Sequence, residues 1–181
     1  MTHQPQNRFL PFLSGGDLRS IAHVDDAIKL VRTQQEFDEL FALLGHPERL
    51  VVMRTADAVE KITKKHPEYL KDHKKEIIQY LSIAKDKELK WHLAELVSRI
   101  ALTASELIKA EAILSWWAKD PKESRIVRVF ALQALFTFLG KSRKYQEELI
   151  QLMNDIEQEN IPSLNARIRK LKKQMDKSKR P

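Results

Sequence analysis

Four similar twelve-residue segments recur along this chain of 181 residues, and the repetition constrains the fold more than any other feature. They read VVMRTADAVEKI at 51–62, LKWHLAELVSRI at 89–100, IVRVFALQALFT at 126–137 and IPSLNARIRKLK at 161–172. Aligned on one alanine in each, they follow one another at intervals of 38, 37 and 35 residues. A period of this length is typical of stacked helix pairs, in which each pair buries its apolar face against its neighbours.

Residues that start and stop helices separate these segments, and no alternating strand pattern longer than a few residues occurs. Glycine, which weakens helices, is found at only 4 positions. The sequence therefore predicts an all-α protein. The expected helices span 24–32, 35–44, 47–65, 67–84, 87–101, 103–118, 121–139, 141–157 and 162–175.

The expected helix starts rest on two devices. Thr103 and Glu106 have the spacing of a capping box, in which the two residues satisfy each other's backbone N–H groups. Proline suits the first position of a helix, because its missing N–H would have no helical partner there. This argument places helix starts at Pro47, Pro67, Pro121 and Pro162. Asp86 and Asp120 are expected to cap the helices that follow them.

The length favours a single domain, expected over residues 23–175. Residues 1–22 contain Pro5, Pro11 and the pair Gly15-Gly16, and they are expected to form an N-terminal arm. This arm docks on the body through its apolar residues Phe9, Leu10, Phe12 and Leu13. Residues 176–181 are expected to be a frayed basic tail.

The charge of the chain is concentrated at its C-terminus. The whole chain has 32 Lys and Arg against 25 Asp and Glu, a formal charge of +7. Residues 167–181 hold eight of the basic residues and one acid, which leaves 24 of each sign before them. The last helix is therefore either a solvated cap on the terminal repeat or a binding site for phosphate groups of RNA, DNA or a membrane surface. The candidate phosphate contacts are Arg169, Lys170, Lys172 and Lys173.

The repeat period, together with the segments MRTADAVEKITKKHPEYLKDHK, KWHLAELVSRIALT and SRIVRVFALQAL, resembles HEAT repeats, which are related to the armadillo-like superhelices. With GGDLRSIAHVDDAIKLV added, the similarity extends to a group of small bacterial HEAT-repeat proteins and covers residues 15–172. The resemblance implies a HEAT-like α-solenoid of about four antiparallel helix pairs, preceded by an arm and a short helix. It implies no reaction and supplies no catalytic residue.

In a stack of this kind the second helix of each pair usually lines the concave face, so its polar residues form the candidate binding surface. An arginine stripe there could bind an acidic peptide, phosphate or nucleic acid. Alternatively, acids such as Asp86 and Asp120 could pair with the same cations between repeats. The candidate residues are Arg54, Asp57, Lys61, Trp91, His92, Glu95, Arg99, Arg125, Arg128 and Arg167.

The tryptophans allow a similar pair of interpretations. Trp116 and Trp117 are adjacent in a helix and point about 100° apart, so one can lie in the core while the other reaches the surface. Packing at a junction between helices is the simpler expectation for such residues. Exposed beside arginine, an indole ring could instead stack on a base.

Few enzyme classes fit the sequence. A HEAT-like DNA glycosylase would need an acid among Trp and Arg side chains, a role open to Asp57 or Glu95 near Trp91, but the neutral body argues against it. The chain has no cysteine, no histidine pair at helical metal-binding spacing and no phosphate-binding glycine loop. No catalytic, metal-binding or cofactor-binding residue is predicted.

The sequence as a whole predicts a non-catalytic protein-interaction module that binds another protein or a peptide. No apolar run approaches the roughly 20 residues of a membrane span, so we expect a cytoplasmic protein. The alternative is a nucleic-acid-binding protein that uses the arginine stripe and the basic C-terminal helix.

Overall fold

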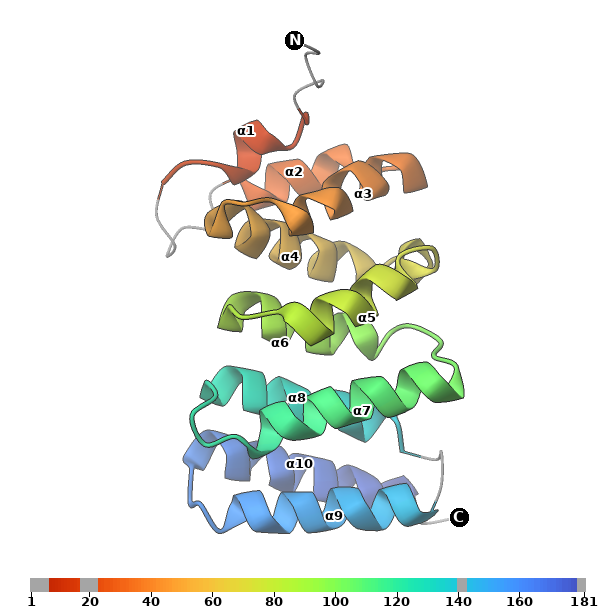
Figure 1. The fold of residues 1–181 in the computed structure, drawn as a ribbon, viewed down its shortest axis with the longest axis vertical. Coiled ribbons are helices and arrows are strands. Elements are labelled where there is room, and N and C mark those ends of the chain that lie inside the picture. The colour runs from red at the N-terminus through yellow and green to blue at the C-terminus, as the bar shows by residue number, and fades with distance from the viewer. Residues whose placement is uncertain (1–6, 17–22, 140–142, 179–181) are drawn as a thin grey trace. The chain divides into compact units, whose positions relative to one another are not determined.

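The chain is helical wherever its structure is described, and the predicted all-α arrangement of helix pairs is confirmed. The computed structural model describes residues 7–16, 23–139 and 143–178, and no strand occurs in these ranges (Figure 1). The chain divides into two compact units, Met1–His73 (unit 1) and Lys74–Pro181 (unit 2). Unit 1 contains one helix pair and unit 2 contains three.

In unit 1 the other helices pack on one long helix, α4. Phe9 and Leu13 are completely buried, as expected for an arm that docks on the body, whereas Leu10 and Phe12 are only partly covered. Residues 1–6 and 17–22 of the predicted arm lie outside the described residues. The elements of unit 1 are α1 (Leu10–Leu13), α2 (Val24–Leu30), α3 (Gln34–Phe41), η1 (Ala42–Gly45), α4 (Arg49–Thr63) and η2 (Pro67–Leu70).

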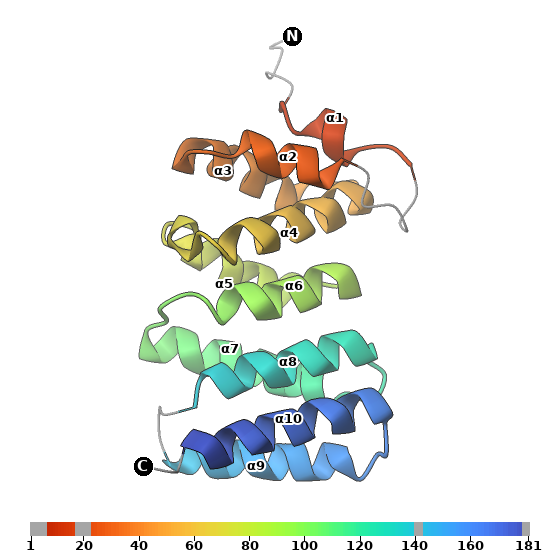
Figure 2. The ribbon, with the colours of Figure 1, turned by 180° about the vertical axis from the view of Figure 1, so that it is seen from behind.

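Unit 2 consists of six helices in two layers, which Figures 1 and 2 show from opposite sides. The first helix of each pair lies in one layer and the second helix in the other, where α8 packs between α6 and α10. The helices are α5 (Lys74–Ile83), α6 (Lys87–Val97), α7 (Ala104–Lys119), α8 (Arg125–Thr137), α9 (Arg143–Glu157) and α10 (Pro162–Ser178).

The small residues of the repeat behave as predicted in α8 and differently in α10. Ala131 and Ala134 are buried, so the neighbouring helices can approach α8 closely. Ala166, which the repeat alignment places at the same position in the last helix, is exposed. Helix α10 packs on α8 and α9, and it buries Leu164 and Ile168 while this alanine faces away from them.

The helix starts follow side-chain capping more closely than they follow proline. Thr103 caps α7 through a complete capping box, as predicted, and Pro162 begins α10. The predictions at Pro47 and Pro121 are wrong, because α4 begins at Arg49 and α8 begins at Arg125. Ser124 caps α8 by accepting a hydrogen bond from the backbone N–H of residue 127. A serine hydroxyl satisfies an unpaired N–H of the first turn, which proline cannot do.

Two further boundaries differ from the expected ones. Pro67 begins the short 3₁₀ helix η2 rather than a long α-helix, and α5 starts only at Lys74. At the C-terminus α10 continues through Ser178, so residues 176–178 of the predicted tail are helical. Residues 179–181 of the predicted tail, and residues 141–142 of the helix expected over 141–157, lie outside the described part of the chain.

Candidate functional site

Three of the predicted surface residues are buried, so the expected stripe of exposed side chains needs correction at these positions. Arg54, His92 and Arg128 each have almost no solvent-exposed surface. They lie on the sides of α4, α6 and α8 that pack against neighbouring elements. These three side chains are part of the interior and cannot line a groove.

Arg54 holds the N-terminal arm in unit 1. Its Nη1 donates hydrogen bonds to the backbone carbonyls of Leu13, at 2.9 Å, and of Gly15, at 2.6 Å. Gly15 and Gly16 have φ angles of +74° and +75°, which favour glycine. A Cβ on Gly16 would also lie 3.3 Å from the Arg54 guanidinium. The Gly-Gly pair therefore lets the chain turn closely around a buried arginine.

Arg128 and Lys90 form ion pairs between repeats in unit 2. Arg128 donates two hydrogen bonds to the Glu159 carboxylate, at 2.6 and 2.7 Å, and a third to a backbone carbonyl. These bonds hold the pKa of Glu159 below its ordinary value, against the smaller opposing effect of burial. Lys90 pairs with Glu123 in the same way. In both cases the acid lies in the turn just before the next second helix, so each pair links one repeat to the next.

Glu123 and Glu159 are the acids of these two pairs, and Glu123 is a near neighbour of Asp120, one of the acids expected there. Asp120 accepts a hydrogen bond from the backbone N–H of Lys122 and so stabilises the local turn instead. Lys90 was not among the predicted residues, although it lies only one position before the residue that the repeat alignment places at Arg128. Aligning the basic residues with the acids about one repeat later would have found both pairs.

Three second-helix residues form a half-buried row across α6, α8 and α10: Trp91, Phe130 and Arg167. The rings of Trp91 and Phe130 lie 5.1 Å apart, and the Arg167 guanidinium lies 5.9 Å from the Phe130 ring. Arg167 also donates a hydrogen bond of 2.6 Å to Gln133. The structure thus brings Trp91 and Arg167 together around an aromatic side chain that the sequence did not single out.

The two acids considered for a glycosylase each lie beside a cation one turn further along the same helix. In unit 1 Asp57 pairs with Lys61 at 2.9 Å, and in unit 2 Glu95 pairs with Arg99 at 3.8 Å. Arg125, the last of the predicted residues, is exposed in the first turn of α8.

The candidate phosphate contacts on α10 are divided between exposed and paired side chains. Arg169, Lys170 and Lys173 are exposed. Lys172 turns toward α9, where its ammonium group lies 2.7 Å from Glu157 and 3.0 Å from Asn154. Three of the four predicted contacts therefore face solvent.

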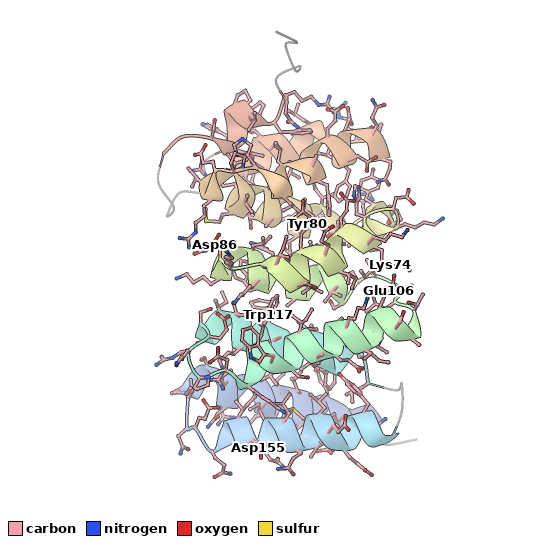
Figure 3. All side chains as sticks on the ribbon, in the orientation of Figure 1. Lys74, Tyr80, Asp86, Glu106, Trp117 and Asp155 are labelled. Carbon is pink, nitrogen blue, oxygen red and sulfur yellow. The ribbon has the colours of Figure 1, made fainter. Side chains whose placement is uncertain are left out.

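A different surface lies in the first-helix layer, where α7 exposes large apolar side chains among its polar ones. Trp117 is 2 % exposed and packs inward with Ala110 and Leu114, whereas Trp116 is 60 % exposed (Figure 3). The prediction that one of the two tryptophans lies in the core is therefore confirmed. Ile108 is also 66 % exposed. Neighbouring exposed apolar side chains of this size mark a candidate contact surface.

Each long side of this open face borders a groove. The groove between α5 and α7, of about 760 Å³, is lined by Ile83, which is 57 % exposed, and by Ile113 and Trp116. An ion pair of 3.2 Å between Lys74 and Glu106 joins the same two helices (Figure 3). The groove between α7 and α9 has a volume of about 550 Å³. Together these features define the α7 surface, which comprises Ile83, Ile108, Ala112, Ile113 and Trp116.

The α7 surface was not predicted from the sequence, because only one apolar face was expected on each helix. The signal was nevertheless present. Ile108, Ala112 and Trp116 recur at intervals of four residues, in addition to the inward-facing set of the same helix. Only the structure shows which of the two sets is covered.

The described residues show neither a metal site nor a membrane-spanning helix. Within residues 7–16, 23–139 and 143–178, no group of three or more His, Cys, Asp or Glu could hold a metal ion. None of the described helices is both long enough and apolar enough to cross a membrane.

The repeated helix pairs and the ion pairs that join them define a helical-repeat protein. The family model described as HEAT repeat domain matches residues 16–175, and the chain therefore belongs to the HEAT-repeat family. No curated protein and no solved structure matches the chain.

Proposed function

We propose that the chain is a protein-binding module and that unit 2 binds its partner through the α7 surface. The observation that carries this proposal is the exposure of three large apolar side chains, Ile83, Ile108 and Trp116, on and beside one helix. Exposed apolar patches of this kind are typical of protein–protein contacts, and tryptophan contributes strongly to binding energy at such sites.

The family supports the same conclusion. Stacked helix pairs build extended surfaces that generally serve protein interaction. In this chain Arg54 and Arg128, two of the cations expected to line the second-helix face, are buried, whereas the first-helix layer exposes Ile83, Ile108 and Trp116. The row of Trp91, Phe130 and Arg167 remains a candidate for an additional contact. A location in the cytoplasm also stays a prediction.

Photo-cross-linking in cells tests this function. The photoreactive residue p-benzoylphenylalanine replaces Ile83, whose side chain opens into the groove beside Trp116. We expect a discrete cross-linked product with another protein, identified by mass spectrometry. A second variant adds Trp116→Asp, which should abolish the product, because a charge at the centre of an apolar contact is costly to bury.

The matched control places the same photoreactive residue at Gln79, an exposed position on the same helix α5 that lines neither groove. Equal cross-linking from Gln79 and Ile83, or a product that survives Trp116→Asp, would contradict binding through the α7 surface.

Nucleic-acid binding is a second candidate function, favoured by the exposure of Arg169, Lys170 and Lys173 on one helix. Fluorescence anisotropy with duplex DNA, single-stranded DNA and RNA, at about 50 mM and about 200 mM salt, tests it. Binding that weakens with salt and is lost in Arg169→Ala/Lys173→Ala would support this candidate. An absence of binding at the lower salt concentration would exclude it.

A further inference from the structure

The groove between α7 and α9 combines an apolar floor with an acidic rim. Leu149 and Leu152 of α9 and Leu135 of α8 form its base, and Ile108 stands on the α7 side. Tyr145 lies in the same groove and donates a hydrogen bond to the Leu135 carbonyl. Tyr145 of α9 is therefore tied to the backbone of α8 at the floor of the groove.

The described charged residues of this groove are mostly acidic. Glu111, Glu148 and Asp155 line it, against one cation, Lys119. Burial raises the pKa of Tyr145, and the negative charges of Glu111 and Glu148 raise it further, so both carboxylates act on the floor of the groove. Asp155 also accepts a hydrogen bond from Gln151, another lining residue, at 2.7 Å.

This acidic groove lies in a unit of opposite formal charge, because residues 74–181 contain 22 Lys and Arg against 14 Asp and Glu. A basic ligand would be repelled by the unit as a whole. A basic ligand must therefore be attracted by the carboxylates that line the groove, and not by the charge of the unit as a whole.

The dimensions of the groove suit a short helix. Its lining residues run from Ile108 to Lys119 on α7 and from Tyr145 to Asp155 on α9. At 1.5 Å per residue these stretches are about 15–17 Å long, the length of about three helical turns. A helix of this length can place apolar side chains on the floor and basic side chains against both acidic walls.

The basic helix of the chain itself does not have the required surface. Helix α10 turns Leu164, Ile168 and Leu171 inward, so its exposed face carries cations without a large apolar anchor. A second copy of the chain bound through α10 would therefore place cations beside the acidic side chains of the groove, but it would leave the leucines of the floor uncovered.

We infer that the groove between α7 and α9 binds a basic amphipathic helix of another protein, with apolar residues on one face and Lys or Arg beside them. The inference rests on the proposed function, because it names the class of segment that a protein-binding module would recognise at this site. The apolar face of the segment covers Ile108 and the leucines of the floor. Its cations pair with Glu111, Glu148 and Asp155.

Binding of two designed peptides to the full chain tests this inference. Each peptide is a fluorescein-labelled helix of about 12 residues, with leucine along one face. One carries lysine at the remaining positions and the other carries glutamate. We expect the lysine peptide to bind at least about tenfold more tightly in fluorescence anisotropy, and its affinity to fall as salt is raised from about 50 to about 300 mM.

Variants locate the binding site. Glu148→Lys/Asp155→Lys should weaken binding of the lysine peptide by about tenfold or more, because both substitutions reverse the charge of the rim. Ile108→Asp should weaken it by removing the apolar contact. The matched control is Glu147→Lys, an exposed acid on α9 that does not line the groove and should alter affinity by no more than about twofold. Circular dichroism verifies that each variant is folded.

Equal affinity for the two peptides, or an unchanged affinity in the Glu148→Lys/Asp155→Lys variant, would overturn the inference. Analytical ultracentrifugation without peptide tests whether a second copy of the chain binds in the groove instead. Self-association that Glu148→Lys/Asp155→Lys abolishes would show a second copy in the groove and would also overturn it. A partner cross-linked from Ile83 without any binding of the lysine peptide would leave the proposed function standing and remove only this inference.

Discussion

A charged side chain in the interior needs a partner, and Arg128 has one in Glu159. The guanidinium is almost completely buried, while the carboxylate keeps contact with solvent and is held by two hydrogen bonds. Removing one member of such a pair is costly because the other charge stays buried. At this scale the buried arginine joins two repeats and is not available to a ligand on the second-helix face.

Glu159→Gln should destabilise the protein by about 1–2 kcal/mol, less than the loss of a fully buried pair, because Glu159 is partly exposed and glutamine still accepts one hydrogen bond. Urea denaturation measures the loss. Glu157→Gln is the matched control, because its partner Lys172 is 35 % exposed where Arg128 is buried, and the pair should contribute less than about 1 kcal/mol. Equal effects of the two substitutions would contradict a special role for the buried arginine.

The same pair predicts a dependence on pH. Because Arg128 lowers the pKa of Glu159 in the folded state, the stabilisation is complete above the ordinary glutamate pKa of 4.5. It is lost as the pH falls through the lowered folded value. The stability difference between the wild type and Glu159→Gln should therefore be constant near neutral pH and shrink below about pH 4.5. Urea denaturation over a pH series tests this, and a difference that grows in acid would be the opposite result.

The same substitution should reduce stability by very different amounts at the two adjacent tryptophans. Trp117→Ala should cost about 3–5 kcal/mol, because it leaves a large cavity between α7 and its neighbours. Trp116→Ala should change stability by less than about 1 kcal/mol, because its side chain faces solvent. Thermal denaturation followed by circular dichroism compares the two. A large loss at Trp116 would mean that its ring is covered and would weaken the proposed α7 surface.

At the scale of the element, capping chemistry decides where helices begin. Thr103 and Glu106 satisfy each other's backbone N–H groups at the start of α7, and Thr33 with Glu36 do the same at the start of α3. The spacing of such a pair is visible in the sequence, because both partners lie within one turn. Pro121 shows the limit of the argument from proline, since it is equally suited to the turn that precedes α8.

Thr103→Ala should destabilise the protein by about 1 kcal/mol, through the loss of the cap at the start of α7. Urea denaturation is again the measurement. Ser82→Ala serves as the control, because its hydroxyl only donates to a carbonyl within α5 and its loss should alter stability by less than about 0.5 kcal/mol. A Thr103→Ala variant as stable as the wild type would show that the capping box contributes nothing.

At the scale of the whole molecule, stability in a repeat protein depends on how many neighbours each helix has. Within unit 2, α8 packs against α6, α7 and α10, whereas α10 packs on α8 and α9 at the end of the chain. Opening α10 therefore exposes less apolar surface than opening α8. The two helices carry related sequences, so their difference reflects position in the stack.

Native-state hydrogen exchange should show this difference, with backbone amides in the middle of α8 exchanging at least about tenfold more slowly than those in the middle of α10. Mass spectrometry after timed labelling measures both helices in the same sample. Equal protection of the two would mean that unit 2 opens only as a whole.

The sequence by itself determined the helical class, the number of helix pairs and most of the helix boundaries, because these follow from local periodicity, repetition and capping within a few residues. It also separated Trp116 from Trp117, since adjacent helical positions point in different directions. Tertiary structure decided which side of each helix is covered. Arg54 and Arg128 turned inward because partners 31 to 41 residues away satisfy them. Ile108 and Trp116 stayed outside because no described helix covers that face of α7, and such burial depends on contacts that local sequence does not contain.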